Sequence, residues 1–231
     1  RSTNEDHGVR KRAETKEGRM KMQRRICWFS CGAASAVATR KTIEDYPDSE
    51  VIPVNCDTRP SEHLDNYRFC QDCERWFGTP IIYIRSQDYE TIDEVFERTR
   101  YMAGPRGARC TTELKKIPRL RFSKPDDVHV FGFTFDERNR IRNFKARNPD
   151  LLLKWPLLDH GITKQDCYDR LHEEGIELPE MYRLGFDNNN CPGCVKASSP
   201  WYWDKVRRNF PSVFERRCQQ SRSIGCRLVE I

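Results

Sequence analysis

The chain has 231 residues, which is enough for one domain of ordinary size with its own hydrophobic core. Hydrophobic residues make up 37% and charged residues 33%, and no stretch approaches the roughly 18 to 20 apolar residues that a membrane span requires. The net charge of +6 is concentrated in the first 25 residues, where nine Lys and Arg stand against four Asp and Glu, so the nearly neutral remainder gives no general argument for nucleic-acid binding.

Residues 1–24 show no apolar periodicity and predict a disordered basic leader. This segment also lacks the apolar core of a signal peptide, so we expect a cytoplasmic protein. Eleven cysteines without an export signal indicate thiols in a reducing compartment, some of them metal-binding, rather than a disulfide scaffold.

From residue 25 onward, short apolar runs alternate with helix-length segments. Strands are predicted over 26–29, 51–55, 81–84 and 128–133, and helices over 35–46, 62–77, 91–101 and 111–122. This alternation predicts an α/β fold with a doubly wound, mostly parallel sheet and helices on both faces. We divide the chain into an α/β domain over 25–160 and a helical, cysteine-bearing C-terminal part over 161–231 that packs on it.

Ligands of doubly wound sheets bind beyond the carboxyl ends of the strands. The first strand is followed by a turn of small residues that runs into a helix, so consecutive N–H groups could hold a phosphate there. An ordinary strand-to-helix turn with an N-capping serine is the alternative. The candidate residues after the first, second and fourth strands are Ser30, Cys31, Gly32, Ala33, Ala34, Ser35, Asn55, Asp57, Glu137, Arg138 and Arg140.

Five motifs in this order resemble the adenine nucleotide alpha-hydrolase-like superfamily, the PP-loop ATP pyrophosphatases, in its phosphoadenosine phosphosulfate reductase-like branch. They are the turn over 30–35, Asp57 with Thr58, the segment 109–118 that begins Arg-Cys-Thr-Thr-Glu, the segment 132–140, and the knuckle Asn-Cys-Pro-Gly-Cys-Val-Lys over 190–196. Small phage and bacterial reductase-like proteins share this pattern, which implies a HUP-like fold and, for a phage-encoded chain, the host cytoplasm.

The resemblance implies that the turn holds the phosphates of ATP or another adenine nucleotide, near Asn55 and Arg109. Asp57, Lys115 and Arg138 would be catalytic, and Lys115, Arg138 and Arg140 would contact phosphate or sulfate. ATP-splitting relatives usually carry an Asp where this chain has Ala34, so Mg²⁺ would need a carboxylate from Asp57, Asp136 or Glu137.

Cys191 and Cys194 form a tight C-x-x-C knuckle, and Cys110 precedes it by 81 residues. Such a knuckle with a distant third thiol suits zinc or an iron-sulfur cluster. The spacing is similar to that of iron-sulfur sulfonucleotide reductases, which implies a [4Fe-4S] cluster with three protein ligands. Completion of the site by Cys31 or Cys56, and a structural zinc ion, remain the alternatives.

The remaining motifs point to structure more than to chemistry. Cys70 and Cys73 share one face of a predicted helix and indicate half-buried core residues rather than a redox pair. Trp201 to Trp203, followed by basic residues up to Arg217, predict an amphipathic helix over the sheet with its aromatic residues inward and its arginines solvated. Single-strand binding is the alternative. Residues 228–231 read as strand-like, and a truncated C-terminus would explain their abrupt end.

Three functions compete at this stage. The first is an enzyme that adenylates an acceptor, such as a nucleobase in nucleic acid, and transfers sulfur or nitrogen to it. The second is a sulfonucleotide reductase, for which Cys218 and Cys226 are the only late candidate nucleophiles. The third is a non-catalytic binding module for nucleotide or nucleic acid. No membrane partner is expected, and a homodimer is left open.

Overall fold

The computed structural model describes residues 22–105 and 107–229, so the predicted leader lies almost entirely outside the described residues. Five strands form one sheet in the order β3-β2-β1-β4-β5, and every neighbouring pair is parallel. The strands are β1 (Arg24–Trp28), β2 (Glu50–Cys56), β3 (Ile82–Ile84), β4 (Val128–Val130) and β5 (Leu152–Lys154). The predicted doubly wound α/β class is confirmed.

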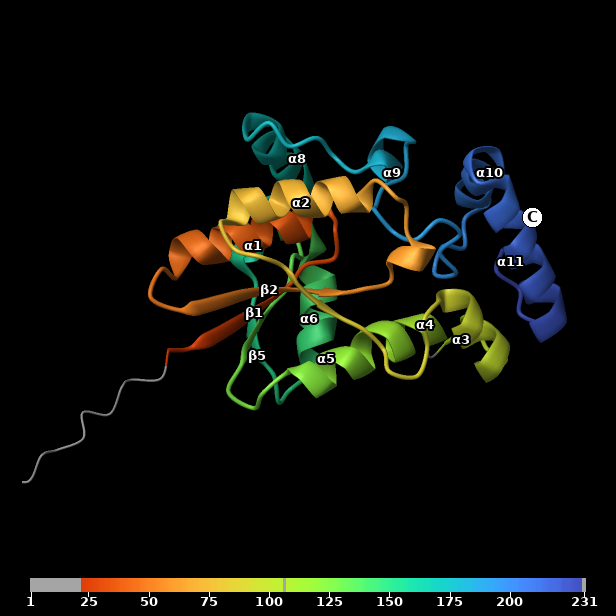
Figure 1. Ribbon diagram of the computed structural model, residues 1–231, viewed down its shortest axis with the longest axis horizontal. Helices are drawn as coiled ribbons and strands as arrows, with labels where there is room; N and C mark the ends of the chain where they lie inside the picture. Colours follow the sequence, from red (N-terminus) through yellow and green to blue (C-terminus); the bar gives the residue numbers. More distant parts are fainter. Residues whose placement is uncertain (1–21, 106, 230–231) are drawn as a thin grey trace, which may run out of the picture.

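Eleven helices are present in the described residues, in layers that Figure 1 shows above and below the sheet. They are α1 (Ala33–Asp45), α2 (Asn66–Phe77), α3 (Ile92–Thr99), α4 (Arg109–Thr111), α5 (Ile117–Phe122), α6 (Arg138–Ala146), α7 (Pro156–Asp159), α8 (Lys164–Glu173), α9 (Glu180–Arg183), α10 (Pro200–Asn209) and α11 (Pro211–Ile224). Not one of them is long and apolar enough to cross a membrane.

Side chains at and just after β1 pack into two separate cores, because successive residues of a strand point to opposite faces of the sheet. Ile26 and Trp28 pack with aromatic residues of α5, α6 and the segment after β4. Phe29, at the end of β1, packs on the opposite face with α1 and α2. Cys167 of α8 belongs to this second core, so the first helix of the C-terminal part covers α1. The boundary that we place at residue 160 stays a prediction.

Several element boundaries differ from expectation. The helix predicted over 62–77 begins only at Asn66, because a 3-10 turn, Arg59–Ser61, precedes it. The helix predicted over 111–122 consists of α4, a π-helical turn (Thr112–Lys116) and α5. The short β5 was not predicted, and residues 226–229 are irregular, so the strand-like interpretation is wrong for those that the structure describes.

Helices α10 and α11 close the side of the molecule toward which β1 and β2 run (Figure 1). Tyr202 and Trp203 are buried in a core between these helices and the segment around α9, while Trp201 is 46% exposed. The predicted amphipathic helix is therefore present, but it packs against α11 and the segment around α9 and not over the sheet.

Candidate functional site

The turn over residues 30–35 lies at the carboxyl end of β1, the middle strand of the sheet. Ser35 organises it, because its hydroxyl accepts hydrogen bonds from the N–H groups of Ser30 (3.1 Å) and Gly32 (3.3 Å) and donates one to the Gly32 carbonyl (2.9 Å). The turn is thus closed by its last serine, which also lies in the first turn of α1.

Some backbone N–H groups of this turn remain available to bind a ligand. Among the described residues, the N–H groups of Cys31, Ala34 and Ser35 have no hydrogen-bond partner, as is usual in the first turn of a helix. The N–H of Ala33 donates only a long bond, 3.4 Å, to the Tyr182 hydroxyl. Free amides at the N-terminus of a 13-residue helix form an electropositive position that suits an anion.

Two asparagines hold the turn from either side. Asn55, buried at the end of β2, donates from Nδ2 to the Phe29 carbonyl at 2.9 Å. Asn189 donates to the Cys31 carbonyl at 2.5 Å and to the side chain of Asn66 at 2.8 Å. Neither Asn66, Asn189 nor Tyr182 was predicted as part of the site, because none follows a strand directly.

Gly132 brings the segment after β4 against the turn. A Cβ built on Gly132 would lie 2.6 Å from Cα of Ser35 and 2.7 Å from the carbonyl carbon and oxygen of Ala34. Only glycine permits this approach, which lies where the sheet order reverses between β1 and β4. Such a switch point is where doubly wound folds bind ligands.

The Asp57 carboxylate is occupied by two arginines. Arg59 binds both of its oxygens at 2.8 and 2.7 Å, and Arg85 contacts the second at 2.7 Å. Burial alone would raise the pKa of Asp57, but these hydrogen bonds outweigh it and lower the pKa to about 2. Asp57 is therefore a fixed anion that positions Arg59 and Arg85. Arg85 is the first residue after β3, so inspecting every strand end would have found it.

The segment after β4 places its charged residues differently. Glu137 accepts hydrogen bonds from Thr134 and pairs with Arg140. Arg138 stacks on Phe135, with its guanidinium carbon 3.8 Å from the ring centre, and has no carboxylate partner among the described residues. Of the two predicted arginines, Arg138 is the one free to meet an anion.

The carboxylates proposed for Mg²⁺ are all engaged. Asp57 is paired as described above, Glu137 caps its own turn, and Asp136 accepts a hydrogen bond from the N–H of Lys164 at 3.3 Å. The described conformation offers no support for a magnesium site at these residues.

Lys115 lies in the π-helical turn, near Cys56 at the end of β2. The Cys56 thiol donates to the Lys115 carbonyl at 3.6 Å, and Glu62 lies 3.9 Å from its ammonium group. Burial lowers the pKa of Lys115, but Cys191, Glu62 and Cys56 outweigh it and hold the pKa above its ordinary value. Arg109, also predicted as a nucleotide contact, pairs with Glu113 at 2.8 Å.

The three predicted metal ligands influence one another electrostatically. Burial raises the pKa of Cys191 to about 12 against the opposing charge of Lys115, and Cys194 and Cys110 raise it further. Burial also raises the pKa of Cys110, and Cys194 adds to this effect. Cys110 and Cys191 pack against the same apolar cluster, although 81 residues separate them.

Thiolates are good ligands for zinc and iron, but these three thiols are not arranged to bind a metal. Within residues 22–105 and 107–229, no group of three or more His, Cys, Asp or Glu side chains is placed to hold an ion. The ammonium group of Lys115 supplies a positive charge among the thiols instead. The predicted [4Fe-4S] or zinc site is therefore not preformed, and Cys31 does not complete it, since its sulfur contacts Cys70.

Helices α10 and α11 hold the knuckle in place. The N–H of Cys194 donates to the Tyr202 hydroxyl at 2.8 Å, and the buried Arg217 donates from Nε to the Gly193 carbonyl at 3.2 Å. Asp93 of α3 in turn pairs with Arg217. Arg217 was expected to be solvated, and this is wrong, because its guanidinium has polar partners in the interior.

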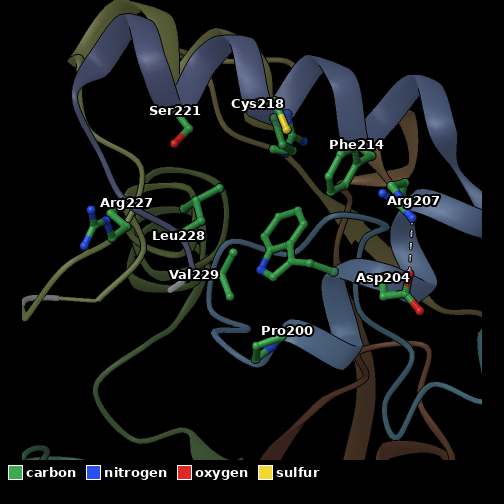
Figure 2. Close-up of a pocket in the computed structure, with 11 residues that line it drawn as sticks. Pro200, Asp204, Arg207, Phe214, Cys218, Ser221, Arg227, Leu228 and Val229 are labelled. Atoms are coloured by element: carbon green, nitrogen blue, oxygen red, sulfur yellow. Dashed lines mark ion pairs between the residues drawn. The ribbon is translucent and has the colours of Figure 1, made fainter. Parts of the chain in front are cut away.

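One cavity lies away from the strand ends. It has a volume of about 380 Å³ between α10, α11 and residues 227–229, with Trp203 and Phe214 on its walls and Asp204 paired with Arg207 at its rim (Figure 2). Cys218 lines it, but no predicted nucleotide contact does. A smaller cavity of about 230 Å³ includes Cys194 and Lys196.

Comparison with known proteins assigns no family. No protein-family model and no curated protein matches the chain. Among solved structures, the chain is similar to the U34-tRNA thiolase NcsA from Methanococcus maripaludis, described with its [4Fe-4S] cluster. The TM-score is 0.38 at 13% identity, over 89% of this chain and 72% of that one. A likeness of this size decides neither the family nor the activity of the present chain.

Proposed function

We propose that this chain is an enzyme that binds ATP with its phosphates at the 30–35 turn and transfers the adenylyl group to an acceptor. Pyrophosphate leaves in that step, and a sulfur or nitrogen nucleophile then displaces AMP from the acceptor. The observation that carries the proposal is the set of free amides at the N-terminus of α1, placed at the switch point of the sheet beside Gly132.

The residues of this chain would act mainly by stabilising the negative charge of the leaving pyrophosphate. Bond cleavage between the α and β phosphates builds negative charge on the leaving pyrophosphate, which amides and fixed cations stabilise. The amides of Cys31, Ala34 and Ser35 are preorganised for this, because Ser35 and Asn189 hold the turn. Arg138 would add a cation without first breaking an ion pair.

The thiols around Lys115 are the proposed place of sulfur transfer. Cys110, Cys191 and Cys194 would hold a [4Fe-4S] cluster only after their side chains move together, because no group of three or more such side chains within residues 22–105 and 107–229 is placed to hold an ion. When bound, such a cluster would supply or bind sulfur for the transfer. The acceptor class that we propose is a nucleobase in nucleic acid, and the exposed Trp201, whose ring lies 4.1 Å from the Lys205 ammonium, offers one surface for stacking.

Calorimetric titration with ATP tests the nucleotide site. Gly32→Asp should lower ATP affinity at least about a hundredfold, since a carboxylate about 4 Å from a phosphate costs about 4 kcal/mol at an effective dielectric constant of about 20. Gly32→Ala adds a Cβ 3.3 Å from the Tyr182 hydroxyl without charge, and Gln165→Glu adds the same charge on the exposed face of α8.

Both control variants should keep ATP affinity within a few fold. Binding of ATP that Gly32→Asp leaves unchanged would remove the nucleotide from the 30–35 turn. Phosphoadenosine phosphosulfate serves as the comparison ligand, and tight binding of it without binding of ATP would replace adenylation by sulfonucleotide reduction.

A further inference from the structure

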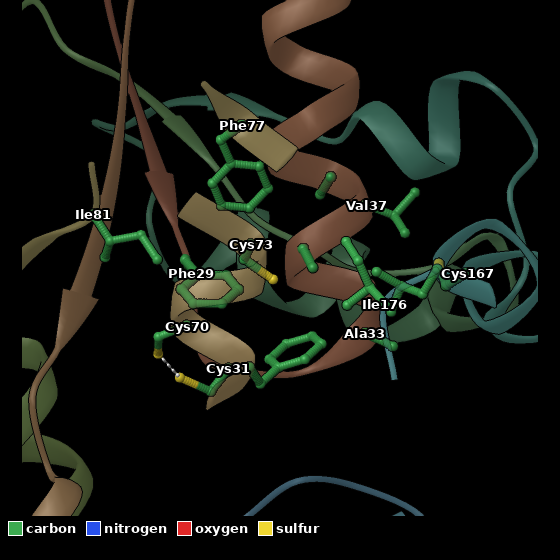
Figure 3. Close-up of a cluster of buried hydrophobic side chains, with 14 of the residues drawn as sticks. Phe29, Cys31, Ala33, Val37, Cys70, Cys73, Phe77, Ile81, Cys167 and Ile176 are labelled. Atoms are coloured by element: carbon green, nitrogen blue, oxygen red, sulfur yellow. Dashed lines mark hydrogen bonds between the residues drawn. The ribbon is translucent and has the colours of Figure 1, made fainter. Parts of the chain in front are cut away.

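Two cysteines that are far apart in sequence meet behind the 30–35 turn. The sulfur of Cys31 lies 3.0 Å from the sulfur of Cys70 on α2, and Figure 3 shows the two side chains pointing toward each other below Phe29. Both residues are at most 2% exposed, and Cys73 lies in the same apolar cluster. The proposed adenylation does not use this pair.

The backbone of Cys31 explains how one residue serves both the turn and the core. Its φ is 55°, a left-handed value that non-glycine residues rarely adopt. In this conformation the side chain enters the core beside α2, while the amide stays in the turn and the carbonyl accepts from Asn189. Any covalent change at the Cys31 sulfur therefore acts directly on the turn.

We propose that Cys31 and Cys70 form a reversible disulfide that restrains the 30–35 turn and weakens nucleotide binding. The restraint on the turn follows from the two positions alone, whereas the effect on nucleotide rests on the proposed function. Formation of the bond pulls the Cys31 sulfur toward α2, and because the Cys31 amide is one of the free amides of the turn, it moves away from the position in which it can meet a phosphate. The covalent tie to α2 then holds the turn in this shifted position.

The bond requires little movement. A disulfide has a sulfur-sulfur distance of about 2.05 Å, so the two sulfur atoms must approach by about 1 Å. Cys70 is the better first nucleophile, because the hydrogen bond from Cys31 lowers its pKa against the effect of burial, helped by Tyr83 and Arg59. The thiolate is the reactive form of cysteine.

Hydrogen peroxide is small enough to be the oxidant of a buried pair. The Cys70 thiolate attacks one peroxide oxygen, which gives a sulfenic acid and releases hydroxide that takes up a proton to form water. Cys31 then attacks the Cys70 sulfur, the sulfur-sulfur bond forms, and the sulfenic oxygen leaves as a second water with the thiol proton. Two thiols lose two electrons, and one peroxide is reduced to two waters.

Peptide mapping after peroxide treatment and alkylation tests the pair. Trypsin releases Cys31 in the peptide 26–40 together with Cys27, and Cys70 in the peptide 69–75 together with Cys73. We expect these two peptides to become linked in the native protein and to separate on reduction. The link should disappear in Cys70→Ser and persist in the matched variants Cys27→Ser and Cys73→Ser. No link, or a link that Cys73→Ser abolishes, overturns the proposal.

Two further measurements test the consequence. Hydrogen exchange of the amides in residues 30–36 should slow on oxidation, and ATP affinity should fall about tenfold, which corresponds to about 1.4 kcal/mol. Both changes should reverse with dithiothreitol and be absent in Cys70→Ser. A mapped disulfide that leaves exchange unchanged refutes the restraint. If the reduced protein binds no ATP, the proposed function fails, while mapping and exchange still decide whether the pair acts as proposed.

Discussion

Replacement of Gly132 by alanine tests whether the contact between the β4 segment and the 30–35 turn shapes the nucleotide site. The added methyl group would lie 2.6 Å from Cα of Ser35 and 2.7 Å from the Ala34 carbonyl, all of them backbone atoms. Restoring an ordinary contact requires a shift of about 0.8 Å, and overpacking of this kind costs about 1 to 3 kcal/mol. For a chain of this length, each kcal/mol lowers Tm by about 2 to 4 °C.

The same shift displaces the free amides of Ala34 and Ser35 from their present positions. Weakened hydrogen bonds to a phosphate should therefore lower ATP affinity by about tenfold or more in Gly132→Ala. Gly175→Ala is the matched control, because Gly175 has φ +68° but no atom within 4 Å of the added Cβ. The control should lose stability through left-handed strain of about 1 to 2 kcal/mol and keep its ATP affinity.

Thermal unfolding and calorimetric titration with ATP measure the two effects on the same preparations. An unchanged Tm in Gly132→Ala would refute the close packing of the two segments. A lowered Tm with unchanged ATP affinity would show instead that the contact stabilises the fold but does not shape the nucleotide site.

The other predictions concern charge and metal. The low pKa of Asp57, about 2 against an ordinary 3.8, contributes about 2 kcal/mol to the free energy of unfolding above pH 4, and this is lost as the pH falls from about 4 to about 2. Denaturant unfolding should thus show Asp57→Asn to be less stable than wild type at pH 7 and nearly as stable near pH 2. A stability difference that does not depend on pH would contradict the low pKa of Asp57. Arg138→Ala should reduce ATP affinity with no change in Tm. Arg142→Ala, on the same exposed helix, should change neither ATP affinity nor Tm. Equal effects of the two substitutions would show that Arg138 is an ordinary surface residue. Anaerobic purification should yield iron in the ratio of a [4Fe-4S] cluster, which should be lost in Cys191→Ser and kept in Cys218→Ser. Zinc alone would indicate a structural knuckle. Absence of both metals from the purified protein would show that the cysteines take no part in the proposed chemistry.

The hydrophobic pattern of the sequence predicts four of the five strands. Residues 26–29, 51–55, 81–84 and 128–133 are apolar runs bounded by polar or helical segments, and each corresponds to a strand of the structure. β5 escaped prediction because Leu152–Lys154 has only three residues and Leu152 is 52% exposed, so no buried run marks it. Its strand conformation depends on pairing with β4, a contact between distant residues.

The sequence by itself determined the parallel α/β class and the position of a small-residue turn at the end of the first strand, because local periodicity encodes the first and a run of small residues between strand and helix encodes the second. Only the tertiary structure decided what surrounds that turn. Gly132 touches Ser35, Cys70 meets Cys31, and Arg85 from the end of β3 reaches Asp57. These contacts join residues of separate strands and helices, whose distances follow from how the elements pack and not from any local pattern.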